Sequence, residues 1–146
     1  MVPGRIERRV VIDRLAWVDR MLAEIRALPL QDKSEFLADS RNVWAAESCL
    51  RRALEALFDL GRHILAKGFG QGVEEYKQIA EELTKAGVLS QEEAQLLRLM
   101  AGYRNRLVHF YHDVTPEELF EICTKDLDDV ERIADAFRTW VRDHQR

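Results

Sequence analysis

Apolar residues recur at alternating spacings of four and three residues in the first part of the chain. They are Val11, Leu15, Val18, Leu22 and Ile25. A helix places residues at these spacings along one face, so the pattern predicts a long amphipathic helix with a narrow apolar seam. Pro29 has no backbone N–H with which to continue this helix and is expected to end it. Residues 28–40 then form a connector, in which residues 34–37 can make a helical turn.

A second long helix is predicted from Ser40 or Arg41 to Lys67, with Gly68 as its stop signal. Its apolar stripe consists of Val43, Ala46, Leu50, Leu54, Leu57, Gly61, Ile64 and Leu65. The small residues Ala46, Ala53 and Gly61 should let a neighbouring helix approach closely, because side-chain size sets the distance between packed helices.

Start and stop signals then define a short helix and a third long one. The short helix covers about residues 74–85 and ends at Gly87. Ser90 and Glu93 have the spacing of a capping box, so a long helix should begin directly after Ser90.

A final long helix is predicted from the Thr115-Pro116 pair to about Arg142. Its acidic residues, from Asp126 to Asp135, are expected to form a solvated face. Alternating runs typical of strands do not occur in the sequence. The fold class is therefore all-α: one domain over residues 1–146, built as an up-and-down bundle of four long helices with one short extra helix.

Composition and charge limit the kinds of partner. Hydrophobic residues make up 47% of the 146 residues, and charged residues make up 33%, which is typical of a soluble helical protein. The formal net charge of −4 gives no general attraction for nucleic acid, so any RNA contact must come from a local patch. One candidate patch contains Arg51 and Arg52. The alternative is that Arg51 belongs to a solvated charge ladder with Glu47 and Glu55, which follow each other at i,i+4 spacing.

Cysteine usage and the N-terminal sequence indicate a cytoplasmic location. Cys49 and Cys123 lie in apolar helical surroundings and are expected to be reduced thiols. The chain has no CxxC pair, no apolar signal core and no apolar run of membrane-spanning length. We therefore expect no metal site, no cofactor and no membrane association.

Polar and titratable residues are crowded into the segment 101–114, at the end of the third long helix. They are Arg104, Asn105, Arg106, His109, Tyr111, His112 and Asp113. At about 100° per residue, Arg104 and Tyr111 lie within about 20° of each other, whereas Arg104 and His109 lie about 140° apart. Asn105 and His109 form an i,i+4 pair, so the amide can orient the imidazole.

These directions predict that one copy of the helix makes a poor catalytic pair. Two copies facing each other across a twofold axis would bring both kinds of side chain into one cleft, and Gly102 beside Tyr103 would allow a close dimer contact. A histidine can act as a general base or acid near neutral pH, and an arginine can bind phosphate oxygens with two N–H groups. Together they suit acid–base chemistry at a phosphate group.

Two other interpretations of this segment are open. His109 can be a structural residue that caps the end of the helix. His109, His112 and Asp113 can also be considered as metal ligands, although three such residues on one turn make a poor catalytic zinc site.

The segment resembles the HepT-like ribonucleases, toxins within the HEPN superfamily of helical domains. Their Arg-x4-His-x-Tyr signature, commonly with Asn after the Arg, is matched by Arg104, Asn105, His109 and Tyr111. Residues 34–40, 51–55 and 86–90 also look like that family. The resemblance covers roughly residues 10–140.

The resemblance implies a homodimeric, metal-independent endoribonuclease that leaves a cyclic phosphate. It would be the toxin of a type VII toxin–antitoxin pair, with RNA and not DNA as its substrate. Arg104 and His109 would be catalytic, with Asn105 in support. Tyr111 would accept AMP from a minimal nucleotidyltransferase antitoxin, and the AMP would block the cleft. Further candidate RNA contacts are Arg106, Arg51, Arg52 and His112.

A second function remains open at this point. The chain can be a non-catalytic HEPN helical module that binds nucleotide or docks a nucleotidyltransferase. Tyr111 would then only pack its ring at the helix end and hydrogen-bond through its hydroxyl. The intact pair of Arg104 and His109 favours the ribonuclease, since a docking module does not need both residues.

Overall fold

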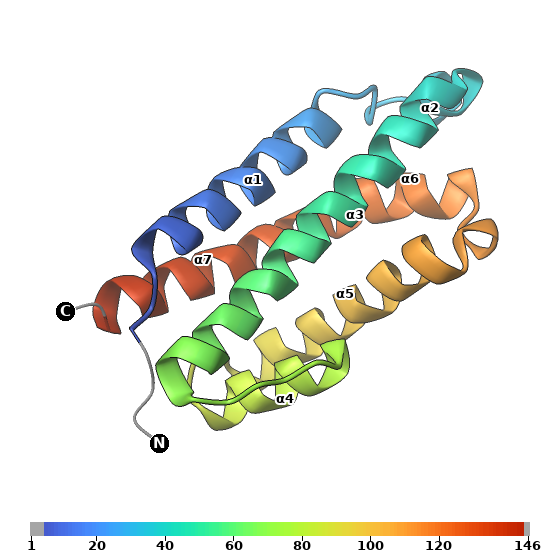
Figure 1. Cartoon of the computed structure of the whole chain (residues 1–146). Helices are drawn as coiled ribbons and strands as arrows, with labels where there is room; N and C mark the ends of the chain where they lie inside the picture. The colour runs from blue at the N-terminus through green and yellow to red at the C-terminus, as the bar shows by residue number, and fades with distance from the viewer. Residues whose placement is uncertain (1–4, 145–146) are drawn as a thin grey trace.

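The computed structural model describes residues 5–144, apart from the side chain of Tyr111, and all regular elements in this range are helical (Figure 1). The all-α fold class predicted from the sequence is confirmed. The elements are α1 (Arg8–Arg26), α2 (Lys33–Ala38), α3 (Ser40–His63) with a π-helical turn (Ile64–Gly68), α4 (Tyr76–Lys85), α5 (Gln91–His109), a 3-10 turn (Tyr111–Asp113), α6 (Pro116–Lys125) and α7 (Leu127–His144).

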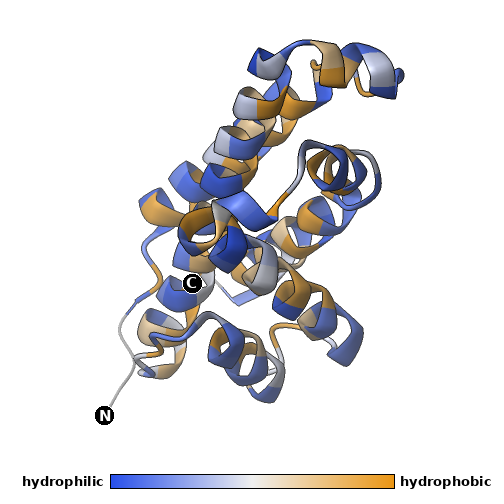
Figure 2. Cartoon of the chain, turned by 90° about the vertical axis from the view of Figure 1, so that its right-hand side faces the viewer, coloured by the Kyte–Doolittle hydropathy of each residue, from blue (hydrophilic) through white to orange (hydrophobic). Residues whose placement is uncertain are grey.

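Helix α3 is the element against which most others pack. It contacts α1 along its length and also meets α2, α4, α5, α6 and α7 (Figure 1). Each long helix has a hydrophobic and a hydrophilic side (Figure 2). The buried core includes Phe58, Leu54, Ile64 and Phe137, all without solvent-exposed surface. Burial of such side chains contributes about 1.5–3 kcal/mol each, which holds the bundle together.

The seam predicted for the first helix is confirmed. Val11, Leu15, Val18, Leu22 and Ile25 are all buried against the core. The predicted close approach at Gly61 is confirmed as well, since a Cβ atom there would lie 3.1 Å from Ile79 Cγ2 and 3.3 Å from Leu83 Cδ1. The missing side chain therefore lets α4 pack directly on α3.

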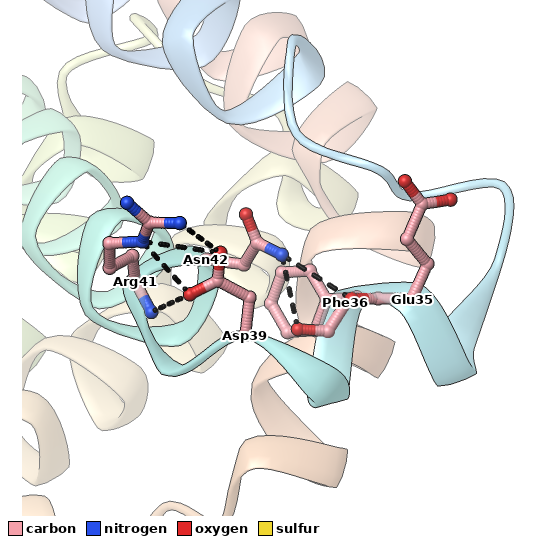
Figure 3. Close-up of polar contacts among 5 residues, drawn as sticks. All are labelled: Glu35, Phe36, Asp39, Arg41 and Asn42. Carbon is pink, nitrogen blue, oxygen red and sulfur yellow. Dashed lines mark hydrogen bonds and ion pairs between the residues drawn. The ribbon is translucent and has the colours of Figure 1, made fainter.

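Polar groups of α3 fix the short connection from α2. The Asp39 carboxylate accepts hydrogen bonds from the Arg41 backbone N–H at 3.0 Å and from the Arg41 guanidinium, which lowers the pKa of Asp39 (Figure 3). The Asn42 amide donates to the Phe36 carbonyl at 3.3 Å (Figure 3). Phe36 itself is fully buried and packs on Phe120, so this junction ties α2 and α3 to α6.

Helix α5, which contains Arg104 and His109, begins where the sequence predicted. Ser90 and Glu93 form both hydrogen bonds of a capping box, at 2.9 and 3.1 Å. Thr115 caps α6 in a similar way, with Pro116 in the first turn. These caps fix where α5 and α6 begin, and so define the segment between them.

Three helix predictions need correction. The α-helical part of the second long helix ends at His63, and a π-helical turn continues from there to Gly68. The connector turn is the separate short helix α2, which is additional to the predicted short helix α4. The predicted last helix is divided at Asp126 into α6 and α7.

The break at Asp126 coincides with a tertiary hydrogen bond that the apolar pattern does not reveal. Asp126 accepts a hydrogen bond from the Tyr103 hydroxyl at 2.9 Å, and its backbone N–H bonds to the Ile122 carbonyl as the cap of α6. Asp126 is therefore a partly buried acceptor and not a member of the solvated acidic face. Burial, followed by the hydrogen bond to Asp126, raises the pKa of Tyr103 to about 12.

Two other expectations concern cysteines and membranes. Cys123 is a buried free thiol and Cys49 is a half-buried one. None of the helices in residues 5–144 combines the length and apolar content that a membrane span requires.

The Tyr103–Asp126 hydrogen bond gives a prediction about stability. Replacing Tyr103 with Phe keeps the ring but leaves the Asp126 carboxylate without this donor, so we expect a loss of about 1 kcal/mol in urea unfolding near pH 7. Because the pKa of Tyr103 is raised in the folded state, its contribution is present at neutral pH and is lost as the pH rises above about 10. The stability difference between wild type and Tyr103→Phe should therefore narrow between about pH 10 and pH 12. A difference that stays constant over this range would contradict the assignment.

Candidate functional site

Arg104 lies in the last two turns of α5 with its guanidinium over an aromatic ring. The Arg104 Cζ atom is 4.3 Å from the centroid of the Tyr76 ring, at the start of α4. Its Nη1 donates to the Asn105 side-chain oxygen at 3.3 Å. Its Nε atom is buried, and the described residues offer it no hydrogen-bond partner. The Arg104 guanidinium is therefore held in position by the Tyr76 ring and Asn105, and no carboxylate of the described residues neutralises its charge.

The i,i+4 spacing predicted that the Asn105 amide would orient His109, but the Asn105 side-chain oxygen instead accepts a hydrogen bond from Arg104. Asn105 and Arg104 are neighbours in the sequence, and the acceptor is the side-chain amide oxygen of Asn105, which contacts the Arg104 guanidinium directly. Asn105 therefore supports the site through the arginine.

His109 is the last residue of α5 and is exposed. Its ring lies edge-on to Phe110, with 6.4 Å between the ring centroids, and Phe110 is itself 58% exposed. His109 follows Arg104 by five positions. On an ideal α-helix this spacing corresponds to about 7.5 Å along the axis and about 140° around it. A single chain therefore presents the two side chains in different directions.

Arg106 has an intramolecular partner. Its two Nη atoms donate to the two carboxylate oxygens of Glu118 at 2.7 and 2.6 Å, and Nη2 also donates to the Asp113 carbonyl at 3.0 Å. The Arg106 hydrogen bond lowers the pKa of Glu118. These contacts hold the turn after α5 against α6. The structure thus gives Arg106 a supporting role, and its predicted RNA contact remains a prediction without support.

The turn after α5 carries the remaining motif residues. The Phe110 backbone N–H bonds to the Arg106 carbonyl at 2.9 Å, and the Asp113 N–H bonds to the Phe110 carbonyl at 2.8 Å. Tyr111 opens the 3-10 turn, and its side chain lies outside the described part of the structure. His112 is exposed on the same turn.

The other two candidate arginines are on α3. Arg51 Nη1 lies 3.4 Å from Glu55 Oε1, as the charge-ladder interpretation predicts. Arg52 donates to the Ser48 hydroxyl at 3.2 Å and lines a hollow of about 310 Å³ with Asp13 and Trp17, between α1 and α3. Both side chains thus have partners on their own helix. Within residues 5–144, the structure contains no group of three or more His, Cys, Asp or Glu side chains arranged to hold a metal ion.

The sequence interpretation missed the environment of Arg104. It gave neither Tyr76 nor Arg62 a role at the site. The Arg62 Cζ atom also lies over the Tyr76 ring, 4.7 Å from its centroid. Tyr76 and Arg62 are far from the motif along the chain, so no local pattern could have joined them to it.

Comparison with known proteins adds independent information. The sequence profile described as "Ribonuclease HepT-like" matches residues 18–137. A curated relative, the "tRNA nuclease HepT" of Aphanizomenon flos-aquae (strain 2012/KM1/D3), is 28% identical over 116 residues, which cover 79% of this chain and 78% of the relative.

Solved structures share the fold. The tri-AMPylated HEPN toxin of Shewanella oneidensis, in complex with its MNT antitoxin, is 22% identical and superposes with a TM-score of 0.81 over 91% of this chain and 99% of that chain. The Bacillus subtilis protein YutE, described as a cytosolic protein of unknown function, is 16% identical, with a TM-score of 0.82 over 96% and 94% of the two chains. Most of the chain matches the family profile, and its helices superpose on a HEPN toxin. The chain therefore belongs to the HepT-like ribonuclease family.

Proposed function

We propose that this chain is the toxin of a type VII toxin–antitoxin pair: a homodimeric, metal-independent endoribonuclease in the cytoplasm. One observation carries the proposal. Arg104 is held with an unpartnered, buried Nε on the same helix as an exposed histidine. The family match and the similarity to a tRNA nuclease support RNA as the substrate.

The proposed chemistry uses these two side chains. His109 takes the proton from a ribose 2′-hydroxyl, whose oxygen attacks the adjacent phosphorus. A second histidine returns a proton to the departing 5′-oxygen, and the products are a 2′,3′-cyclic phosphate and a 5′-hydroxyl. Arg104 stabilises the extra negative charge on the phosphorane through its N–H donors.

A second copy of the chain supplies the second histidine in this proposal. Arg104 and His109 point in different directions within one chain, so a twofold axis beside α5 would complete the cleft. The outer surface of α5 is suited to such a contact. Leu99 is 47% exposed, and a Cβ atom at Gly102, nearly one turn further along, would meet no atom within 4 Å.

The proposed partner is a minimal nucleotidyltransferase antitoxin. The similar Shewanella protein is described as tri-AMPylated and in complex with an MNT antitoxin. In this chain Tyr111 follows His109 by two residues, at the start of an exposed turn. AMP on its hydroxyl would add bulk and negative charge to the turn that follows His109 and would compete with the RNA phosphate.

Loss of either catalytic side chain should abolish cleavage. We expect Arg104→Ala and His109→Ala each to lower the rate of RNA cleavage by at least about 100-fold, because each removes charge stabilisation or proton transfer. Arg142→Ala and His144→Ala are matched controls at the end of α7, on the opposite side of the molecule (Figure 1). Cleavage should persist in EDTA. Cleavage at the wild-type rate by either motif variant, with circular dichroism unchanged, would show that the replaced residue is not catalytic, whereas a wild-type protein that cuts no RNA would favour a non-catalytic HEPN module.

The homodimer can be tested at Gly102. A glutamate there meets open space within one chain, so the fold should tolerate it, but two glutamates would face each other across a twofold contact. We expect Gly102→Glu to be monomeric by light scattering while wild type is dimeric. Gly72→Glu is the control, because its Cβ position is also open and it lies in a loop. A dimer that survives Gly102→Glu would place the interface elsewhere.

Tyr111 should be the acceptor of AMP. Co-expression with a minimal nucleotidyltransferase antitoxin should add the mass of one or more AMP groups to wild type and should inhibit RNA cleavage. Tyr111→Phe lacks the acceptor oxygen, so it should remain unmodified and largely active. Intact-mass spectrometry distinguishes the two results. An adduct that remains on Tyr111→Phe would show a different acceptor, and Tyr103→Phe is then the comparison variant.

A further inference from the structure

Tyr76 is the residue that most directly contacts the proposed catalytic arginine from another element. It is the first residue of α4, and its ring centroid lies 4.3 Å from the Arg104 Cζ atom. At this distance the ring face attracts the guanidinium by a cation–π interaction. The contact joins the start of α4 to the C-terminal half of α5.

The Tyr76 ring is itself fixed from α3. Phe58 is fully buried and meets the ring edge-on, with centroids 4.8 Å apart. Arg62 Cζ lies 4.7 Å from the same centroid. Arg62 in turn donates from Nε to the Val73 carbonyl at 3.2 Å and from Nη2 to the Glu74 carbonyl, which holds the loop that leads into α4. The ring therefore has a defined position before any ligand arrives.

An aromatic partner affects Arg104 differently from a carboxylate. A carboxylate would accept hydrogen bonds from the N–H groups and would offset the positive charge, as Glu118 does for Arg106. An aromatic ring attracts the guanidinium while leaving its charge in place and its in-plane N–H groups available for phosphate oxygens. The Tyr76 ring can therefore order the flexible Arg104 side chain without neutralising its positive charge.

We propose that Tyr76 is a positioning residue for Arg104: its ring holds the guanidinium in the orientation in which its donors meet the RNA phosphate. This inference rests on the proposed ribonuclease function. Tyr76 does not itself touch the reacting atoms. Its aromatic ring, and not its hydroxyl, performs this role, so a phenylalanine should replace it and an aliphatic residue should not.

Steady-state cleavage of one RNA by three proteins tests the proposal. Tyr76→Phe should retain a kcat within about twofold of wild type. Tyr76→Leu keeps apolar bulk but lacks a ring, and its kcat should fall at least about tenfold, with a smaller change in KM, because the arginine acts mainly on the transition state. Equal kcat values for the Leu and Phe variants would overturn the proposal.

A matched control separates positioning from simple packing. Leu83→Ala removes a fully buried side chain of α4 that packs beside Gly61 and has no part in the Arg104 contact. It should lower the melting temperature at least as much as Tyr76→Leu and yet change kcat much less. If the two variants lose kcat in proportion to their loss of stability, Tyr76 has only a structural role and the proposal fails.

The contact can also be measured without RNA. In urea unfolding, the effects of Tyr76→Leu and Arg104→Ala should be non-additive when combined, because either change alone removes the same interaction. Additive effects would overturn the contact itself. A wild-type protein that cuts no RNA but shows coupled unfolding would overturn the proposed function, and with it the positioning role of Tyr76 in catalysis, while leaving the contact established.

Discussion

The interaction of Arg104 with the Tyr76 ring is the constraint on which the proposed site depends. Among the described residues, the Arg104 guanidinium contacts an aromatic ring and a neighbouring amide oxygen, and its Nε is buried without a partner. Arg106, two residues later on the same helix, has both of its Nη atoms bonded to Glu118. Arg106 thus supports the fold through its ion pair, while the positive charge of Arg104 is not neutralised by a carboxylate of the described residues. In a chain of net charge −4, such a local cation is the feature that can attract phosphate.

The surrounding structure fixes the end of α5 around this arginine. The capping box at Ser90 defines where the helix begins, the Tyr103–Asp126 hydrogen bond attaches it to the junction of α6 and α7, and the Arg106–Glu118 pair holds the turn that follows. His109 lies at the end of this braced segment and remains exposed. Rigid support with exposed functional groups suits the proposed site, which would hold a flexible RNA strand during proton transfer.

Helix positions were largely predictable because they follow from local patterns. The seam of α1, the stripe of α3 and the capping signals of α5 and α6 are all encoded within a few turns of sequence. The break at Asp126 was missed because the apolar period continues through it, and only a hydrogen bond from the distant Tyr103 marks it. Similarly, the motif identified Arg104 and His109, but partners far away in sequence decided the surroundings of Arg104 and the intramolecular role of Arg106.

The ends of the cleaved RNA test the proposed chemistry most directly. If His109 and Arg104 promote attack by the ribose 2′-hydroxyl, the wild-type protein should leave a 2′,3′-cyclic phosphate on one fragment and a 5′-hydroxyl on the other. A substrate with a single 2′-deoxy nucleotide at the cleaved position should then remain intact, because the attacking oxygen is missing. Fragments that end in a 3′-hydroxyl and a 5′-phosphate, or normal cleavage of the 2′-deoxy substrate, would contradict this account.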